Sequence, residues 1–243
     1  HLFLQPAVSD SDEFVIFNFC DGIFLSCQRE RTKRLDVKNT SDVEIEVKFY
    51  VISLDDIAEK IIDLGGKLVT ERIFEKNLRF DTADQKLRNL HQVLRLRQDK
   101  DNILTFKGAV ETGKPVSIRQ EIEVVVDDFE TTRKLLKGLG YEVVMEYEKY
   151  RTTYSLLDTL VVLDELPYGK FIEIEGPDGN SIQKVARNLN LNWKTRVMTN
   201  YTYLFETLIG NRPELKGKFL TFETLKGMSI MPDELGVNPA DLY

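Results

Sequence analysis

Histidine and cysteine, the side chains most often used in metal sites and nucleophilic catalysis, are nearly missing from this chain of 243 residues. It has two histidines, His1 and His91, and two cysteines, Cys20 and Cys27. With His1 at a chain end, no convincing Ser-His-Asp triad or paired-histidine zinc site can be assembled. Two cysteines near the N-terminus cannot supply a disulfide framework or a cysteine metal cage for the main body. Any metal must therefore be held by oxygen ligands, which suit Mg²⁺, Mn²⁺ or Ca²⁺.

Long apolar runs and an excess of positive charge are also lacking. The run FVIFNFCDGIFL, at 14–25, is broken by Asn18, Asp21 and Gly22 and has no basic residues before it. We therefore expect neither a membrane span nor a cleaved signal peptide. The net charge of −7 argues against binding of the whole chain to nucleic acid or to anionic membrane. We expect a cytoplasmic protein, a monomer or a homodimer, whose partner is a small molecule.

The composition indicates one main domain. With 42% hydrophobic residues, the chain can bury one large core, or one core plus an appendage. Residues 1–42 are interpreted as a leader and a polar linker outside the fold, and no function is assigned to them. The domain is expected at 43–210, followed by a C-terminal tail at 211–243 that packs on it.

Within the domain, charged and aliphatic residues alternate in one segment after another. In EIEVKFYV, Glu44, Glu46 and Lys48 share one face, because alternate side chains of a strand lie on the same side. The same separation recurs in LRLR at 94–97, LTFKG at 104–108, IRQEIEV at 118–124, EKYR at 148–151 and KFIEIEG at 170–176. If these strands close into one sheet, their charged faces could line a single space.

Helix and strand signals predict about eight strands and few helices, the latter near 54–64, 129–139, 178–190 and 199–209. Most strands are joined by short hairpin connections. This favours an α+β, mainly β fold, namely an eight-stranded antiparallel β-barrel with covering helices. The charges would face the lumen, and aliphatic residues would face outward under the helices: Ile45, Leu94, Leu96, Ile122, Ile172 and Ile174.

A lumen lined by both signs of charge needs either mutual pairing or a ligand. Removing an isolated charge from water costs on the order of several kcal/mol unless it is paired or ligated. Arg and Lys bind phosphate oxygens, and carboxylates hold Mg²⁺ or Mn²⁺, which bridges protein to phosphate. The pattern is thus typical of a site for a polyanion carried with divalent cations. For any one strand, the plainer interpretation is a solvated face with weak ion pairs.

Taken in chain order, these segments carry recognisable motifs. EIEVK has the form ExExK, and NLRFDTADQKL resembles a strand and turn of the YFDT type. VLRLRQ, LTFKG, IRQEIEV, EKYR and the hairpin LDELPYGKFIEIEG follow, and NYTYLFETL resembles a closing helix. In this order they resemble the CYTH domain, the triphosphate tunnel metalloenzyme superfamily, over about 43–210. One departure is Arg79, where the family usually has an aromatic residue; this side chain could lie in the tunnel or outside it.

The resemblance implies an eight-stranded tunnel that acts on nucleoside, thiamine or inorganic triphosphates with Mg²⁺ or Mn²⁺. Lys48 would be the catalytic residue, which assists proton transfer or steadies the reacting phosphoryl group. Glu121 could instead pair with a neighbouring arginine, and Asp164 could take a turn or outward role. Carried over position by position, the metal would be held by Glu44, Glu46, Glu121, Glu123, Asp164, Glu173 and Glu175. The phosphates would be held by Lys48, Arg95, Arg97, Lys107, Arg119, Lys149 and Arg151.

Three functions remain open from the sequence. The closing hairpin looks most like the class IV adenylyl cyclase branch, whose members convert ATP to cyclic AMP and pyrophosphate. The alternative is a triphosphatase for inorganic, nucleoside or thiamine triphosphate. A second alternative is a non-catalytic module that binds polyphosphate or a nucleotide, although the complete acidic set argues against it. Trp193, Tyr201 and Tyr203 are expected to be packing residues rather than a platform for a base.

Overall fold

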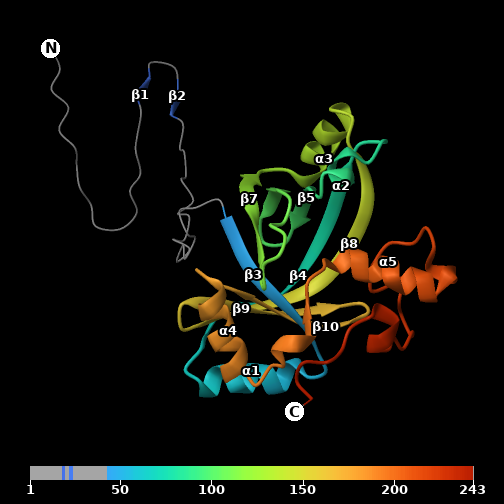
Figure 1. Ribbon diagram of the computed structural model, residues 1–243. Helices are drawn as coiled ribbons and strands as arrows, with labels where there is room; N and C mark the ends of the chain where they lie inside the picture. The colour runs from blue at the N-terminus through green and yellow to red at the C-terminus, as the bar shows by residue number, and fades with distance from the viewer. Residues whose placement is uncertain (1–17, 20–21, 24–42, 243) are drawn as a thin grey trace. The chain divides into compact units, whose positions relative to one another are not determined.

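The computed structural model describes residues 18–19, 22–23 and 43–242 (Figure 1). The chain divides into two units, 1–38 and 39–243. In the first, Asn18–Phe19 (β1) pairs with Gly22–Ile23 (β2) in antiparallel fashion. The rest of the expected leader lies outside the described residues.

Eight antiparallel strands of the second unit close into a ring, here called the strand ring. Their order is β10-β9-β8-β4-β5-β6-β7-β3, and β10 also pairs with β3. Arg196–Val197 (β11) adds to β3 beside the ring. The mainly β fold and the closed antiparallel sheet expected from the sequence are therefore confirmed. The strands are β3 (Val43–Val51), β4 (Lys67–Asp81), β5 (Val93–Gln98), β6 (Asn102–Lys107), β7 (Ser117–Val126), β8 (Glu142–Leu156), β9 (Thr159–Leu166) and β10 (Gly169–Glu175).

The helices are α1 (Leu54–Asp63), α2 (Lys86–Asn89), α3 (Phe129–Gly138), α4 (Gly179–Asn188) and α5 (Tyr201–Asn211). None of those described is long and apolar enough to cross a bilayer. The sequence did not predict α2, because four residues are too few to show a helical period. Its position depends on Asp81, whose carboxylate accepts hydrogen bonds of 2.9 Å from the backbone N–H groups of Leu87 and Arg88.

Apolar side chains of the ring point outward, under the helices. Helices α1 and α4 lie at one end of the ring and cover Ile172 and Ile174 (Figure 1). Helix α3 covers Leu96 near the other end, with Leu94 at the margin of that cluster. Ile122 contradicts the expectation that all such residues are covered: it is 46% exposed and lies outside the apolar clusters that the described residues form. Ile45 packs at the margin of the cluster under α1 and α4.

A third apolar cluster joins α5, the C-terminal tail and one end of the strand ring. Leu204 and Phe205 of α5 pack in it with Leu220 and Leu235 of the tail. The tail also pairs with β8 through the backbone, because the N–H of Leu220 donates to the carbonyl of Glu146 at 3.0 Å. Residues beyond α5 thus share a core with the ring.

Asp241 links the tail to the junction between β3 and α1. Its carboxylate accepts hydrogen bonds from the N–H groups of Ile52 and Ser53 at 2.9–3.0 Å. We expect Asp241→Ala to lower the free energy of unfolding by about 1–2 kcal/mol, since two backbone donors lose a charged acceptor. Urea denaturation measures the change. Asp233→Ala, at an exposed position of the tail, serves as the control; equal midpoints for the two variants would show that this link contributes nothing.

Candidate functional site

The charged residues singled out in the sequence face the inside of the strand ring. The evidence is ion pairs between strands that are not neighbours in the sheet. Lys107 on β6 reaches Glu44 on β3 at 2.8 Å, past β7. Arg151 on β8 reaches Glu173 on β10, past β9. Side chains converge on the concave side of a closed sheet, which brings residues of second-neighbour strands together. The two signs of charge therefore share one interior.

Three carboxylates from adjacent strands meet inside the ring, and we call them the acidic cradle. Glu44 and Glu46 lie on β3, and Glu175 on β10 pairs in register with Glu46. One oxygen of each lies within 4.8 Å of the others. Burial, together with Glu44 and Glu46, raises the pKa of Glu175 to about 8. Crowded carboxylate oxygens of this kind fit a hard divalent cation such as Mg²⁺ or Mn²⁺, which would offset their repulsion.

Basic residues flank the acidic cradle. Arg119 donates to Glu44 at 3.0 Å and to Glu46 at 3.1 Å. Burial opposes the charge on Glu44, yet Lys107 and Arg119 outweigh it and hold the pKa of Glu44 well below its usual range. Glu121 lies 3.2 Å from Lys107; burial raises its pKa to about 7, and the charge of Glu44 adds to this effect. The cradle is therefore surrounded by groups that can bind phosphate oxygens.

A second charged cluster lies toward α5. Asp164 is fully buried and accepts hydrogen bonds from Lys149 at 3.0 Å, from Arg151 at 2.7 Å and from the hydroxyl of Tyr201 at 2.9 Å. Glu173 pairs with Lys48 and Arg151. Cations thus already contact both carboxylates. Metal binding by Asp164 and Glu173, as by Glu121 and Glu123, remains a prediction.

Lys48 is held as an ammonium group at the centre of this second cluster. Its Nζ lies 2.6 Å from Glu173 Oε1 and 4.5 Å from the centre of the Tyr201 ring. Burial disfavours the charged form, but Glu173 and Glu46 outweigh this effect and raise the pKa of Lys48. Lys48 can therefore supply positive charge to a bound anion; its role in proton transfer remains a prediction.

The comparisons with known proteins agree with this architecture. The family model of the CYTH domain matches residues 42–199. The chain belongs to the CYTH domain family. A protein of Methanocaldococcus jannaschii, provisionally named an adenylate cyclase, is 30% identical over 135 residues, which cover 55% of this chain and 76% of the relative.

Solved structures share the CYTH fold. A protein of Pyrococcus horikoshii is 27% identical with a TM-score of 0.56, over 65% of this chain and 96% of its own. A provisionally named adenylyl cyclase of Hippeastrum, described as revealing a dominant triphosphatase activity, is 18% identical with a TM-score of 0.54. That match covers 68% of this chain and 95% of the Hippeastrum chain and bears on the fold alone.

Strand β4 adds interior residues to the CYTH site that the sequence analysis did not assign. Glu75 is buried, 3.5 Å from Lys149; burial opposes its charge, but Lys149, Arg151 and Arg97 lower its pKa to about 2. Asn77 and Arg79 follow on the same face. Alternation in EKNLR, with the parity found in the other strands, could have indicated them. The open question about Arg79 is thereby decided in favour of the interior.

Tyr201 was expected only to pack. Its ring does pack against Phe171, with centroids 5.1 Å apart, but its hydroxyl also donates to Asp164. A hydroxyl role of this kind depends on where α5 docks, which a local pattern does not reveal. Tyr201 therefore couples the last helix to the charged interior.

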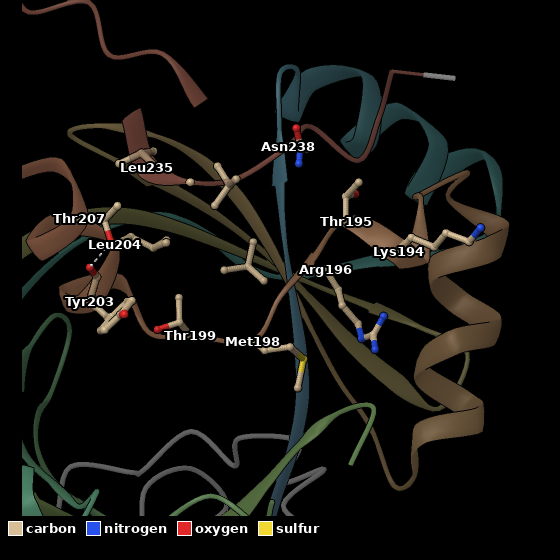
Figure 2. A pocket seen from close by; sticks show the side chains of 13 residues that line it. Lys194, Thr195, Arg196, Met198, Thr199, Tyr203, Leu204, Thr207, Leu235 and Asn238 are labelled. Carbon is tan, nitrogen blue, oxygen red and sulfur yellow. Dashed lines mark hydrogen bonds between the residues drawn. The ribbon is translucent and has the colours of Figure 1, made fainter. Parts of the chain in front are cut away.

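A separate surface pocket of about 550 Å³ lies between β11, α5 and the tail (Figure 2). Thr199, Tyr203 and Asn238 are among its lining residues. Figure 2 shows the side chains of Lys194 and Arg196 extending away from Tyr203 and Thr207. None of the candidate metal or phosphate residues lines this pocket, so it is not part of the site formed inside the ring.

Proposed function

We propose that this CYTH protein binds a triphosphate together with Mg²⁺ or Mn²⁺ inside the strand ring and hydrolyses its terminal phosphoryl group. The single observation that carries the proposal is the acidic cradle, with Lys107 and Arg119 directly beside it. A site that must neutralise a phosphate chain and activate a nucleophile needs both kinds of residue in one place.

Glu44, Glu46 and Glu175 would hold the metal. Their donor set is entirely carboxylate oxygen, as hard divalent cations require. A bound ion of this type offsets phosphate charge and lowers the pKa of a coordinated water. Glu121 and Glu123, on the neighbouring wall of the ring, are further candidates.

The interior cations would hold the phosphates by exchanging partners. Lys48, Lys107 and Arg119 are now paired with carboxylates at 2.6–3.0 Å. A buried ion pair gains little net free energy once the cost of removing both charges from water is counted. Phosphate oxygens can therefore replace some of the carboxylate contacts without a large loss of free energy. Lys48, fixed between Glu173 and Tyr201, would steady the reacting phosphoryl group. Arg95, Arg97, Lys149 and Arg151 complete the proposed phosphate set.

Adenylyl cyclase activity is the second candidate, and the name of the M. jannaschii relative favours it. That reaction needs ATP with its adenosine seated so that the ribose 3′-hydroxyl faces the α-phosphorus. At the α5 end, Tyr50, Phe171 and Tyr201 already pack on one another, with centroids 5.1–5.2 Å apart. These rings are engaged with each other rather than presented to a base, so hydrolysis fits the interior better.

Product analysis separates the candidates. The whole chain is incubated with ATP, inorganic triphosphate or thiamine triphosphate under Mg²⁺ or Mn²⁺. We expect release of orthophosphate. Excess EDTA should abolish turnover, because the proposed reaction needs a divalent ion in the acidic cradle. Cyclic AMP with pyrophosphate would establish the second candidate. Binding without any product would support a non-catalytic module, and activity that persists in excess chelator would contradict the metal role.

A further inference from the structure

Arg79 differs from the other interior cations in its partners. Each of the seven basic residues proposed to hold phosphate lies within 4.0 Å of a carboxylate oxygen. Arg79 has no such contact among the described residues. It donates one hydrogen bond, from Nη1 to Thr202 Oγ1, and Thr202 donates onward to Asn200. Since a guanidinium carries five N–H donors, most of its binding capacity is unused.

Other cations lie close to Arg79. Its partner in register on β5 is Arg95. Burial, with Arg119 and Arg95 nearby, lowers the pKa of Arg79, although Tyr147 and Glu206 partly oppose this effect. In the order of the ring, β4 stands four strands away from β3 in either direction. Arg79 thus lies on the wall opposite the strand that carries Glu44 and Glu46.

Asn77 supplies a second, independent sign of a ligand. It lies on the same face of β4, two residues before Arg79, and its exposed fraction is 0%. Neither its amide nitrogen nor its amide oxygen has a hydrogen-bond partner within the described part of the chain. Arg95 Nε is unpartnered in the same way. Buried polar groups in folded proteins are nearly always satisfied, so three neighbouring residues with unused donors indicate a place where a ligand binds.

We propose that Asn77, Arg79 and Arg95 form an anion subsite opposite the acidic cradle, and that this subsite selects inorganic triphosphate over nucleoside triphosphates. The inference rests on the proposed function, in which the ring binds a triphosphate. If the cradle and its metal take one end of the phosphate chain, the opposite wall meets the other end. A nucleotide would place a neutral ribose there and leave Arg79 unpaired. A free phosphate would bring the charge and the acceptor oxygens that these side chains need.

The test measures binding, so that it does not depend on turnover. The whole chain is titrated calorimetrically with inorganic triphosphate and, separately, with ATP. Both titrations contain Ca²⁺, a divalent cation that takes oxygen ligands, and each gives one affinity. We expect wild-type protein to bind inorganic triphosphate at least about 10-fold more tightly than ATP. Arg79→Gln should weaken triphosphate binding about 10- to 100-fold and ATP binding less than about 3-fold.

Two further variants make the result specific. Arg72→Gln removes an exposed arginine of the same strand that pairs with Glu165, and both affinities should stay unchanged. Arg79→Lys keeps the charge but loses the forked donors, and should show a smaller loss confined to triphosphate. If Arg79→Gln fails to fold, the wild-type preference and Arg79→Lys decide the matter.

Equal wild-type affinities, equal losses for both ligands, or no measurable binding of inorganic triphosphate would overturn the subsite. A separate assay of phosphate release distinguishes this failure from that of the proposed function. If phosphate is released from both ligands and both bind with equal affinity, the subsite is refuted and the proposed hydrolysis is supported. If inorganic triphosphate binds selectively but no phosphate is released under Mg²⁺ or Mn²⁺, the proposed hydrolysis is refuted and the subsite is supported.

Discussion

Glu46→Gln is expected to reduce triphosphate turnover by at least about 100-fold and to weaken Mn²⁺ binding, while the fold stays intact. Glu46 is buried and contributes one of the three carboxylates of the acidic cradle. Glutamine has nearly the same shape but no negative charge, so the cradle loses a metal ligand and keeps its packing. Changes to residues that merely orient metal ligands already cost about 10- to 100-fold, and loss of a ligand should cost more. Calorimetric titration with Mn²⁺ and an assay of phosphate release measure the two effects.

Glu165→Gln is the matched control for this prediction. Glu165 follows Asp164 on β9 and therefore has the opposite parity; it pairs with Arg72 instead of facing the interior. Its replacement removes the same charge and should leave both metal binding and turnover unchanged. Full activity of Glu46→Gln, measured beside this control, would show that the cradle holds no catalytic metal.

Lys149→Met should produce the largest loss of stability, about 3–5 kcal/mol in the free energy of unfolding. Lys149 is 1% exposed, and its ammonium lies 3.0 Å from Asp164 and 3.5 Å from Glu75, both buried. Methionine fills similar space but leaves part of that negative charge uncompensated, and breaking a buried ion pair on one side is costly. Urea denaturation of the whole chain, monitored by circular dichroism, measures the change.

The comparison for this variant is Arg133→Met on α3. Arg133 pairs with Glu130 one helical turn away, and both side chains are largely exposed to solvent. Solvent screens such pairs, so this replacement should change the free energy of unfolding by no more than about 0.5 kcal/mol. If the two variants unfolded at the same urea concentration, Arg151 alone would be sufficient to compensate Asp164 and Glu75.

Local alternation was enough to determine which residues share a face. The spacing of Glu44, Glu46 and Lys48 places them on one side of β3 whatever the strand packs against, because the backbone of a strand repeats every two residues. The same rule predicted the outward direction of Ile172 and Ile174. The closed, mainly β fold was predicted instead from about eight strands joined mostly by hairpins. Short hairpin connections made the antiparallel pairing of β5 with β6, and of β9 with β8 and β10, predictable. Strands joined through α1 or α3 behave differently: β3 and β4, like β7 and β8, follow one another in sequence but are not neighbours in the sheet.

Only the closed ring decided which of these charges meet. Contacts such as Lys107 with Glu44 join strands separated by another strand, so they depend on curvature and register rather than on any local period. The docking of α5 placed the hydroxyl of Tyr201 on Asp164, and the absence of a covering apolar cluster left Ile122 exposed among the described residues. For the same reason the sequence determined that Arg79 is a cation on the charged face of a strand, whereas the tertiary structure decided that no carboxylate of the described residues lies within 4.0 Å of it. Ion pairing depends on distances between residues that lie far apart in the sequence. These distances are set only when the chain folds.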